Sequence, residues 1–402
     1  MGASSGSGPA PLAGIRVVEV CQVLSGPVCA MQLADLGADV VKIENPRSPD
    51  FTRSQGETRN GQTSYFYIVN RGKRSLGLDA TVPEGRALLA RLVDGADVVV
   101  QNMRPGKAAA LGIGPDECLA RNPSLVYASI SGFGATGPAA GEPVYDYVIQ
   151  GVTGMVDLQR DPASAKADLV RNFVADKVTS QATVQAILAA LMARERDPER
   201  RGQHVEVSML EAVLSFFWVD GMMLHTLVDE PEATMAYPGD YYRVYPTTDG
   251  AVIVMPVMPP FDGICRAAGH PEWIDDPRWA DPEERYRNMA AFTDVLAEAI
   301  APFSTAEITA AMNAEDVPVG QVVALERVHE HPQIRAMGSV VEHEVPYLGR
   351  VRQARPAWRF GRTPAVVHAG APQVGDHTDE ILAELGLEAA EIEALRASGA
   401  LA

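Results

Sequence analysis

One acidic residue and one group of cations in this sequence have types and positions that could support chemistry. The acid is Asp176, in the segment FVADKVTS at the start of a long helical pattern. A carboxylate can attack an activated carbonyl group or act as a general base. Asp is also a favoured N-cap residue, and on these residues alone the N-cap is the better interpretation of Asp176.

The cations lie in the segment 71–75, which reads RGKRS, and at Arg104. They stand out because the formal net charge of the chain is −18. Clustered Lys and Arg side chains commonly bind phosphate groups. The sequence therefore predicts a local site for an anionic small ligand. Its overall acidity argues against nucleic acid or an anionic membrane as the main partner.

Alternating strand and helix patterns in the first 135 residues must position these side chains. Short apolar runs predict strands at 15–20, 39–43, 96–100, 125–130 and 204–207. A long helix is expected from about residue 177 to residue 196, ahead of the last of these strands. Short continuous apolar runs are typical of parallel strands that are buried on both faces. The sequence therefore predicts an α/β fold with a doubly wound parallel sheet.

In such a sheet, ligands bind outside the carboxyl ends of the strands. The segments that follow the predicted strands are rich in Gly, Asn and Arg, and include CQVLSGP, ENPR, QNMRPG and SGFG. The first turn lacks the GxGxxG of a dinucleotide site, and the chain has no GxxxxGK[ST] of a P-loop, which argues against both kinds of nucleotide site. The chain also has no HExxH or CxxC, so no metal site is expected.

The pattern changes along the 402 residues and predicts three parts. Residues 10–224 are expected to form the first portion of a large Rossmann-like domain, 225–325 a small α+β domain, and 326–402 a return linker with the last portion of the large domain. Asp249 and Gly250 mark a hairpin turn in the small domain. The N-terminus lacks a signal-peptide pattern and no run of eighteen apolar residues occurs, so the predicted location is cytoplasmic.

Several longer motifs occur in one order along the chain: LAGIRVVEV, SGPVCAMQLADLGADVVKIENP, NRGKRSLGLD, DVVVQNMRPG, SLVYASISGFGATGP, YDYVIQ and RGQHVEVSMLEA. Together they resemble the class III CoA-transferase family, also called CaiB/BaiF. The resemblance extends from about residue 11 to the C-terminal HTDEILAELGL. It implies a coenzyme A (CoA) thioester as substrate, no permanently bound cofactor, and an interlocked homodimer.

The resemblance also implies which residues contact the CoA thioester. The nucleotide and pyrophosphate would be held by Lys73, Arg74, Asn102, Met103 and Arg104, and the pantetheine side would be lined by Val23, Leu24 and Ser25. Family members often have an arginine or a proline where this chain has Asn45, and Arg47 is the candidate substitute for that arginine.

In this family the catalytic aspartate aligns with Asp176. It would carry an anhydride, then an aspartyl-CoA thioester, then a second anhydride, which exchanges CoA between two acids. The family also uses a mobile glycine loop to donate backbone N–H groups to the oxyanions. The candidate segment here is 238–240, which contains Gly239.

An α-methylacyl-CoA racemase from the same family is the alternative, with Asp176 as one of two acid/base groups. Racemases have a histidine followed by Asp where this chain has Tyr145 and Asp146. Because tyrosine has a pKa of about 10, it is a poor base at neutral pH. The transferase is therefore favoured, with Tyr145 and Asp146 as substrate-pocket residues. An acyl-CoA-binding protein without catalysis is a second alternative, and the donor and acceptor acids are not predicted.

Overall fold

The computed structural model describes residues 8–160, 166–229, 242–256 and 260–401, and the chain divides into two compact units. The larger unit combines residues 1–156, 169–216 and 338–402, and the smaller unit combines 157–168 and 217–337. The chain therefore leaves the larger unit and returns to it. The smaller unit begins before the expected boundary at residue 225 and includes a short segment ahead of the long helix.

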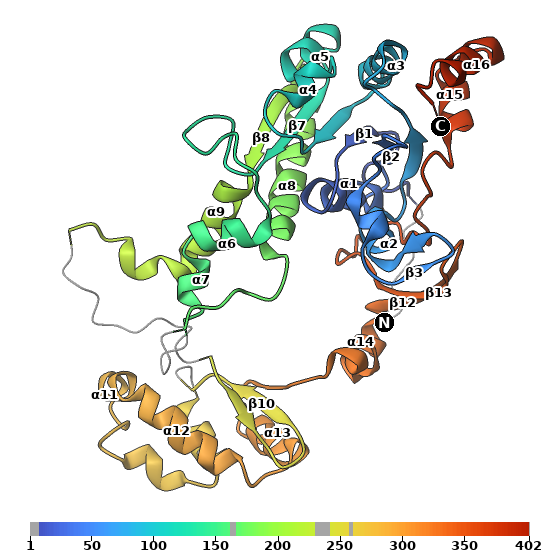
Figure 1. Cartoon of the computed structure of the whole chain (residues 1–402). Helices are drawn as coiled ribbons and strands as arrows, with labels where there is room; N and C mark the ends of the chain where they lie inside the picture. The colour runs from blue at the N-terminus through green and yellow to red at the C-terminus, as the bar shows by residue number, and fades with distance from the viewer. Residues whose placement is uncertain (1–7, 161–165, 230–241, 257–259, 402) are drawn as a thin grey trace. The chain divides into compact units, whose positions relative to one another are not determined.

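A six-stranded parallel sheet forms the centre of the larger unit (Figure 1). Its strands in spatial order are β5 (Arg74–Gly77), β2 (Asp39–Glu44), β1 (Arg16–Val20), β6 (Val98–Gln101), β7 (Val126–Ser131) and β8 (Gln203–Ser208). From β1 the chain first adds strands on one side, and from β6 onward it adds them on the other. This order confirms the predicted doubly wound α/β fold and places a topological switch point between β1 and β6.

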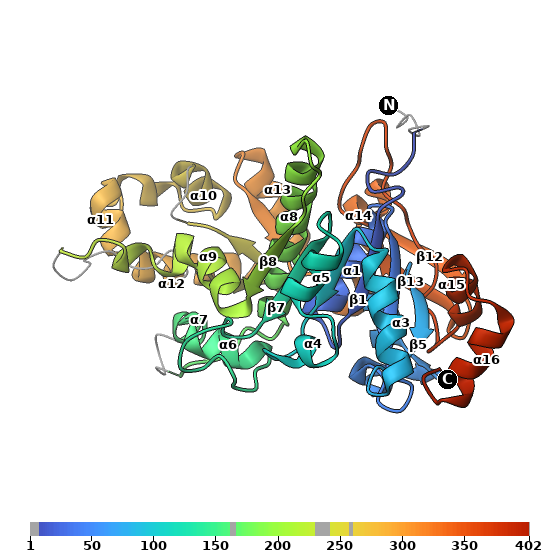
Figure 2. The same cartoon turned by 90° about the horizontal axis from the view of Figure 1, so that it is seen from above.

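Helices cover both faces of this sheet (Figure 2). The helices that the chain forms up to residue 221 are α1 (Ser25–Asp35), α2 (Ser64–Asn70), α3 (Pro83–Asp94), α4 (Lys107–Ala110), α5 (Pro115–Arg121), α6 (Asp146–Val152), α7 (Met155–Leu158), α8 (Val174–Arg196) and α9 (Met209–Gly221). Near the C-terminus, the larger unit adds α15 (Thr378–Glu384) and α16 (Ala389–Ala397).

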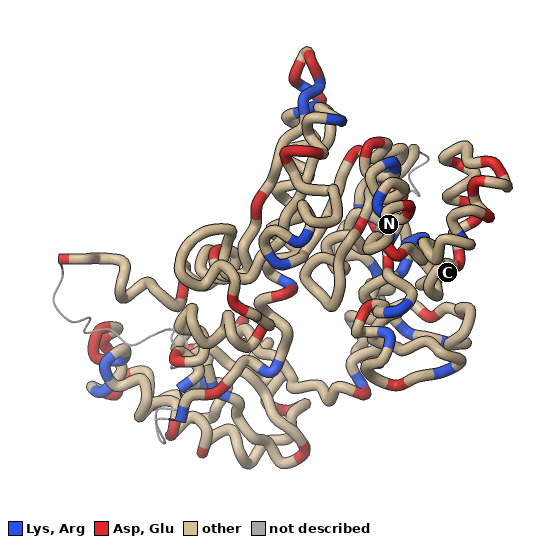
Figure 3. Tube along the Cα trace, turned by 45° about the horizontal axis from the view of Figure 1, so that its top comes forward, with Lys and Arg blue, Asp and Glu red and all other residues tan. Residues whose placement is uncertain are grey.

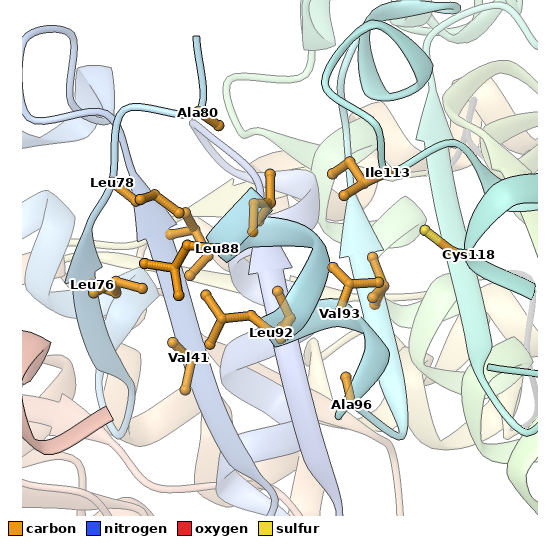
Figure 4. Close-up of a cluster of buried hydrophobic side chains, with 14 of the residues drawn as sticks. Val41, Leu76, Leu78, Ala80, Leu88, Leu92, Val93, Ala96, Ile113 and Cys118 are labelled. Carbon is orange, nitrogen blue, oxygen red and sulfur yellow. The ribbon is translucent and has the colours of Figure 1, made fainter. Parts of the chain in front are cut away.

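Alternating residues of the strands serve two separate cores. Val17 and Val98 belong to the cluster that includes α1 and α8. Val18 and Val99 belong to the cluster that includes α3 and α15. Figure 4 shows part of this second core, where Leu88 and other side chains of α3 lie over the strands. Because both faces are covered, several of the strands contain short apolar runs such as the one at Val98–Val100, which is why the sequence pattern predicted them.

The strand β5 was missed by the sequence pattern. The motif RGKRS at 71–75 indicates only a cluster of cations, whereas the structure begins β5 at Arg74. This strand pairs with β2 in parallel, from Val41 opposite Arg74 to Glu44 opposite Gly77. Because the strand is only four residues long and starts with one charged and one polar side chain, its apolar signal is too short to recognise.

The smaller unit has an α+β composition. Its antiparallel sheet contains β11 (Val319–Gln321), β10 (Ala251–Val254) and β9 (Val244–Pro246), and its helices are α10 (Phe261–Ala267), α11 (Pro282–Arg287), α12 (Met289–Ile300), α13 (Thr305–Ala314) and α14 (Pro332–Met337). The predicted hairpin turn at Asp249 and Gly250 lies between β9 and β10. The aromatic side chains of Trp279 and Phe292 are completely buried in its core.

Two short antiparallel hairpins complete the larger unit, β3 (Thr58–Arg59) with β4 (Gln62–Thr63), and β12 (Val340–Val345) with β13 (Gly349–Ala354). Acidic and basic residues are interspersed along the Cα trace (Figure 3). Within the described residues, no single helix has the length and apolarity to cross a membrane, although α12 and α13, bent by 120°, pass such a test as a pair.

Candidate active site

A cavity of about 810 Å³ lies at the switch point of the sheet. It is lined by residues that follow the carboxyl ends of β1, β2, β6 and β7, and by Asp176 from the first turn of α8. The fold thus forms a cavity where a doubly wound sheet usually binds its ligand. Two hydrogen bonds join the two sides of the switch point: Asn102 accepts from the Gln22 N–H at 3.0 Å and donates to the Gln22 carbonyl at 2.8 Å.

Most of the predicted site residues are brought together in this cavity. Its lining includes Val23, Ser25, Asn102, Met103, Arg104, Tyr145 and Asp176. Leu24 does not line it but is buried in a small apolar cluster with Val28 and Met31. Gly239 and the candidate loop 238–240 lie outside the described residues.

Lys73 and Arg74 do not line the cavity. The Lys73 ammonium group is completely buried, 2.7 Å from a carboxylate oxygen of Glu19 and 2.7 Å from the side-chain oxygen of Asn70. Arg74 lies at the amino end of β5 and donates to Asp39 and Glu384. Because ligands bind at the opposite, carboxyl edge of a parallel sheet, this geometry does not support the predicted CoA contacts of these two residues.

Arg104 and Lys107 are the cations that do line the cavity, just after β6. In the part of the chain that the structure describes, neither forms an ion pair within 4.0 Å. Lys107 was not among the predicted site residues, although it lies three residues after Arg104 at the same strand end. Asn45 also lines the cavity, whereas the Arg47 side chain is 70% exposed and lies 3.3 Å from Asp79.

Asp176 is not an N-cap, so that interpretation of the sequence is wrong. Helix α8 begins at Val174, its N-cap is Phe173, and no side-chain hydrogen bond is made by that cap. Asp176 is the third residue of the helix, and its own backbone N–H donates to Oδ2 of Asp146 at 3.1 Å. Asp146, thirty residues earlier, therefore accepts the bond that an N-cap side chain usually accepts.

Asp146 is fixed behind the cavity rather than in its lining. It is the first residue of α6 and is buried, with 4% of its surface exposed. Gln150, one turn later, donates its side-chain amide to Oδ1 of Asp146 at 2.6 Å. The amide oxygen of Gln150 accepts from the Val170 N–H at 3.0 Å. This arrangement ties α6 to the segment that leads into α8.

The surroundings of Asp176 make it a more basic carboxylate than usual. Burial raises the pKa of Asp176 to about 6, the nearby Asp146 carboxylate contributes in the same direction, and hydrogen bonds from the backbone and side chain of Ser25 oppose them. Ser25 is the first residue of α1. The Ser180 hydroxyl lies 2.7 Å from the Ser25 carbonyl and 2.8 Å from the Asp176 carbonyl. Asp176 is thus ionised at neutral pH, more basic than an exposed Asp, and next to two helix N-termini.

Comparisons with known proteins find relatives that match nearly the whole chain. The family model described as CoA-transferase family III matches residues 12–378. The succinate–glutarate CoA-transferase of Agrobacterium fabrum is 34% identical over 388 residues, which cover 93% of this chain and 96% of that protein. The formyl-CoA:oxalate CoA-transferase of Escherichia coli is 30% identical over 421 residues, which cover 97% and 99% of the two chains.

A solved structure shows the same fold over the same extent. The crystal structure of a CaiB/BaiF family protein from Brucella suis superposes with a TM-score of 0.81 at 32% sequence identity. The superposition covers 94% of this chain and all of the other.

Proposed function

This chain belongs to CoA-transferase family III and is an enzyme of that class, and we propose that it transfers CoA from an acyl-CoA thioester to a small carboxylic acid through covalent intermediates on Asp176. One observation carries the proposal. A buried carboxylate with a raised pKa lines the cavity at the switch point of the sheet, next to the N-terminus of α1. A desolvated, more basic carboxylate is a better nucleophile towards an activated carbonyl.

The proposed reaction exchanges acyl groups between Asp176 and CoA. The Asp176 carboxylate attacks the thioester carbonyl carbon, and the carbon–sulfur bond breaks. The CoA thiolate departs, and the donor acyl group now forms an anhydride with Asp176. The thiolate then attacks the aspartyl carbonyl carbon and releases the donor acid as its carboxylate. The acceptor carboxylate attacks the resulting aspartyl-CoA thioester and displaces the thiolate. The thiolate finally attacks the acceptor carbonyl of the second anhydride, which yields the new thioester and restores Asp176.

The tetrahedral intermediates need donors close to Asp176. The backbone N–H and the hydroxyl of Ser25 face the Asp176 carboxylate and lower its pKa. Ser25 begins α1 and Asp176 lies in the first turn of α8. Because helix N-termini carry a partial positive charge, both helices favour negative charge at this point. We propose these groups as oxyanion donors; the loop 238–240 stays a sequence prediction.

The pH dependence follows from the raised pKa of Asp176. Only the ionised carboxylate attacks the thioester, so kcat/KM should rise tenfold per pH unit below about 6 and level off above it. The sign follows because an acid with a raised pKa gains its proton as the pH falls through 6. Steady-state kinetics from pH 4.5 to 8.5 measure this profile. An acid limb of kcat/KM with its midpoint near pH 4 would contradict the raised pKa of Asp176.

Arg104 and Lys107 are the proposed partners of the CoA phosphates. Replacing either with alanine should raise the KM for the acyl-CoA about tenfold, since each removes a charge-assisted contact, and should change kcat little. The salt dependence of KM should weaken in both variants. Arg47→Ala is the matched control: its side chain is exposed and does not line the cavity. A KM change in the control equal to that of Arg104→Ala would argue against this assignment.

The relatives suggest small dicarboxylic acids as substrates, because their names include succinate, glutarate and oxalate. The test is a matrix of succinyl-CoA and formyl-CoA as donors against glutarate, oxalate and monocarboxylic acids as acceptors, with products identified by mass spectrometry.

The covalent route can be tested by trapping. Hydroxylamine added during turnover should convert Asp176 to its hydroxamate, which peptide mapping locates. Turnover with no adduct at Asp176 would count against the covalent route, and solvent deuterium at the α-carbon would favour the racemase. The homodimer stays a prediction.

A further inference from the structure

Val23 has a backbone conformation that its side chain disfavours. Its φ is 68°, in the left-handed region, and Val23 lines the cavity. For a β-branched residue this conformation is an outlier. Such strain persists only where the surroundings hold the backbone in place, and it gathers at functional sites. Neighbouring groups must therefore hold the Val23 backbone at this φ.

Asp50 provides the acceptor. Its Oδ1 accepts the Val23 N–H at 3.1 Å, across 27 residues of chain. The same oxygen accepts the backbone N–H and the hydroxyl of Thr52, at 3.0 and 2.8 Å. Asp50 is 1% exposed, so water cannot replace it as an acceptor. With its backbone N–H bonded to Glu44 at 3.1 Å, Asp50 is itself held at the end of β2.

Lys42 connects this acceptor to the same cavity wall. Its ammonium group lies 2.9 Å from Oδ2 of Asp50, 2.9 Å from the Cys21 carbonyl and 3.0 Å from Glu19. Lys42 is completely buried, and these oxygens satisfy all its donors. A single cation on β2 therefore holds the carbonyl two residues before Val23 and also the carboxylate that binds the Val23 N–H.

We propose that Lys42 and Asp50 are positioning residues of the acyl-CoA site, and that they act by keeping Val23 in its left-handed conformation. This shape of the segment 21–25 places the Gln22 backbone against Asn102, and it places Ser25 beside Asp176, since the Ser180 hydroxyl donates to the backbone carbonyls of both residues. Without the acceptor, Val23 returns to negative φ and both contacts shift. The inference rests on the proposed function, because it assigns the cavity to acyl-CoA.

The test is a double-mutant cycle between Asp50→Ala and Val23→Gly, read as the Kd for free coenzyme A by calorimetry. Glycine adopts positive φ as readily as negative φ, so it does not need the Asp50 acceptor to stay there. Asp50→Ala should weaken binding about tenfold when residue 23 is valine and no more than about threefold when it is glycine. An equal loss in both backgrounds would overturn the proposal, because a general loss of packing has no reason to depend on residue 23.

Thr52→Val is the matched control. It removes one hydrogen bond to the same oxygen of Asp50 but leaves the bonds to Val23 and Lys42, so it should lower the melting temperature with Kd changed less than about twofold. If Asp50→Ala does not fold, amide hydrogen exchange of the unaltered chain decides. The Val23 N–H should be strongly protected, and rapid exchange there would overturn the proposal. A chain without CoA binding would refute the proposed function as well, whereas binding without coupling would refute this inference alone.

Discussion

Replacing Asp176 with asparagine should lower the rate of CoA transfer at least about a thousandfold and leave the Kd for coenzyme A within about threefold. The amide has nearly the same size and keeps an oxygen that can accept from Ser25, so the cavity keeps its shape. What it loses is the nucleophilic carboxylate, without which no anhydride forms. Single-turnover kinetics and calorimetry on the same preparation measure the two quantities separately.

The same substitution should stabilise the fold at neutral pH. The pKa of Asp176 is raised to about 6, above its value in the unfolded chain. The folded protein therefore binds this proton more tightly, and its stability falls as the pH rises from about 4 to about 6. At pH 7.5 this cost is on the order of 2 to 3 kcal/mol, and Asp176→Asn removes it. The variant should thus be less active but more stable. Thermal unfolding at pH 5 and 7.5 measures the change in stability.

Asp116→Asn is the control for both measurements. Asp116 is an exposed acid in the first turn of α5 and does not line the cavity, so its replacement should leave turnover unchanged and should not reproduce the gain in stability. Transfer activity that survives in Asp176→Asn at more than about a tenth of the original rate would exclude Asp176 as the nucleophile. Loss of CoA binding in that variant would instead point to a collapsed site.

The local features of the site were predictable from sequence because short segments encode them. The apolar runs predicted the parallel sheet, and in such a sheet ligands bind at the carboxyl ends of the strands. Asn102 and Arg104 follow directly from that argument, since each comes within a few residues of the end of β6. The local pattern alone could not identify Asp176 as a site residue, because an aspartate near the start of a helix is usually an N-cap. The motif resemblance, not the local pattern, selected it.

Several features that the sequence could not supply depend on long-range contacts. In the sequence, Lys73 has the features of a phosphate ligand. In the structure, it pairs in the core with Glu19 of β1. The cap of α8 comes from Asp146, on a different helix. A sequence shows charges but not which of them are buried against each other. The left-handed Val23 is equally hidden, because its acceptor is remote and its residue type argues against that conformation.

Asp146 combines two effects on the nucleophile, and two substitutions can separate them. Its oxygen accepts the Asp176 N–H, which fixes the first turn of α8. Its charge raises the pKa of Asp176. Asparagine removes the charge but keeps an oxygen in reach of that N–H, whereas alanine removes both. Both variants should therefore shift the acid limb of kcat/KM below pH 6, since the neighbouring negative charge is gone.

Only Asp146→Ala should also lower kcat strongly, by about a hundredfold, because a nucleophile displaced by about 1 Å loses about that factor. The lost cap should cost the alanine variant a further 0.5 to 2 kcal/mol or so of stability relative to asparagine. Pre-steady-state rates and pH profiles of both variants distinguish the two roles. Equal kcat values would show that the hydrogen bond does not position Asp176. An unshifted acid limb in both would show that the Asp146 charge has no influence on the nucleophile, and that burial alone sets its pKa.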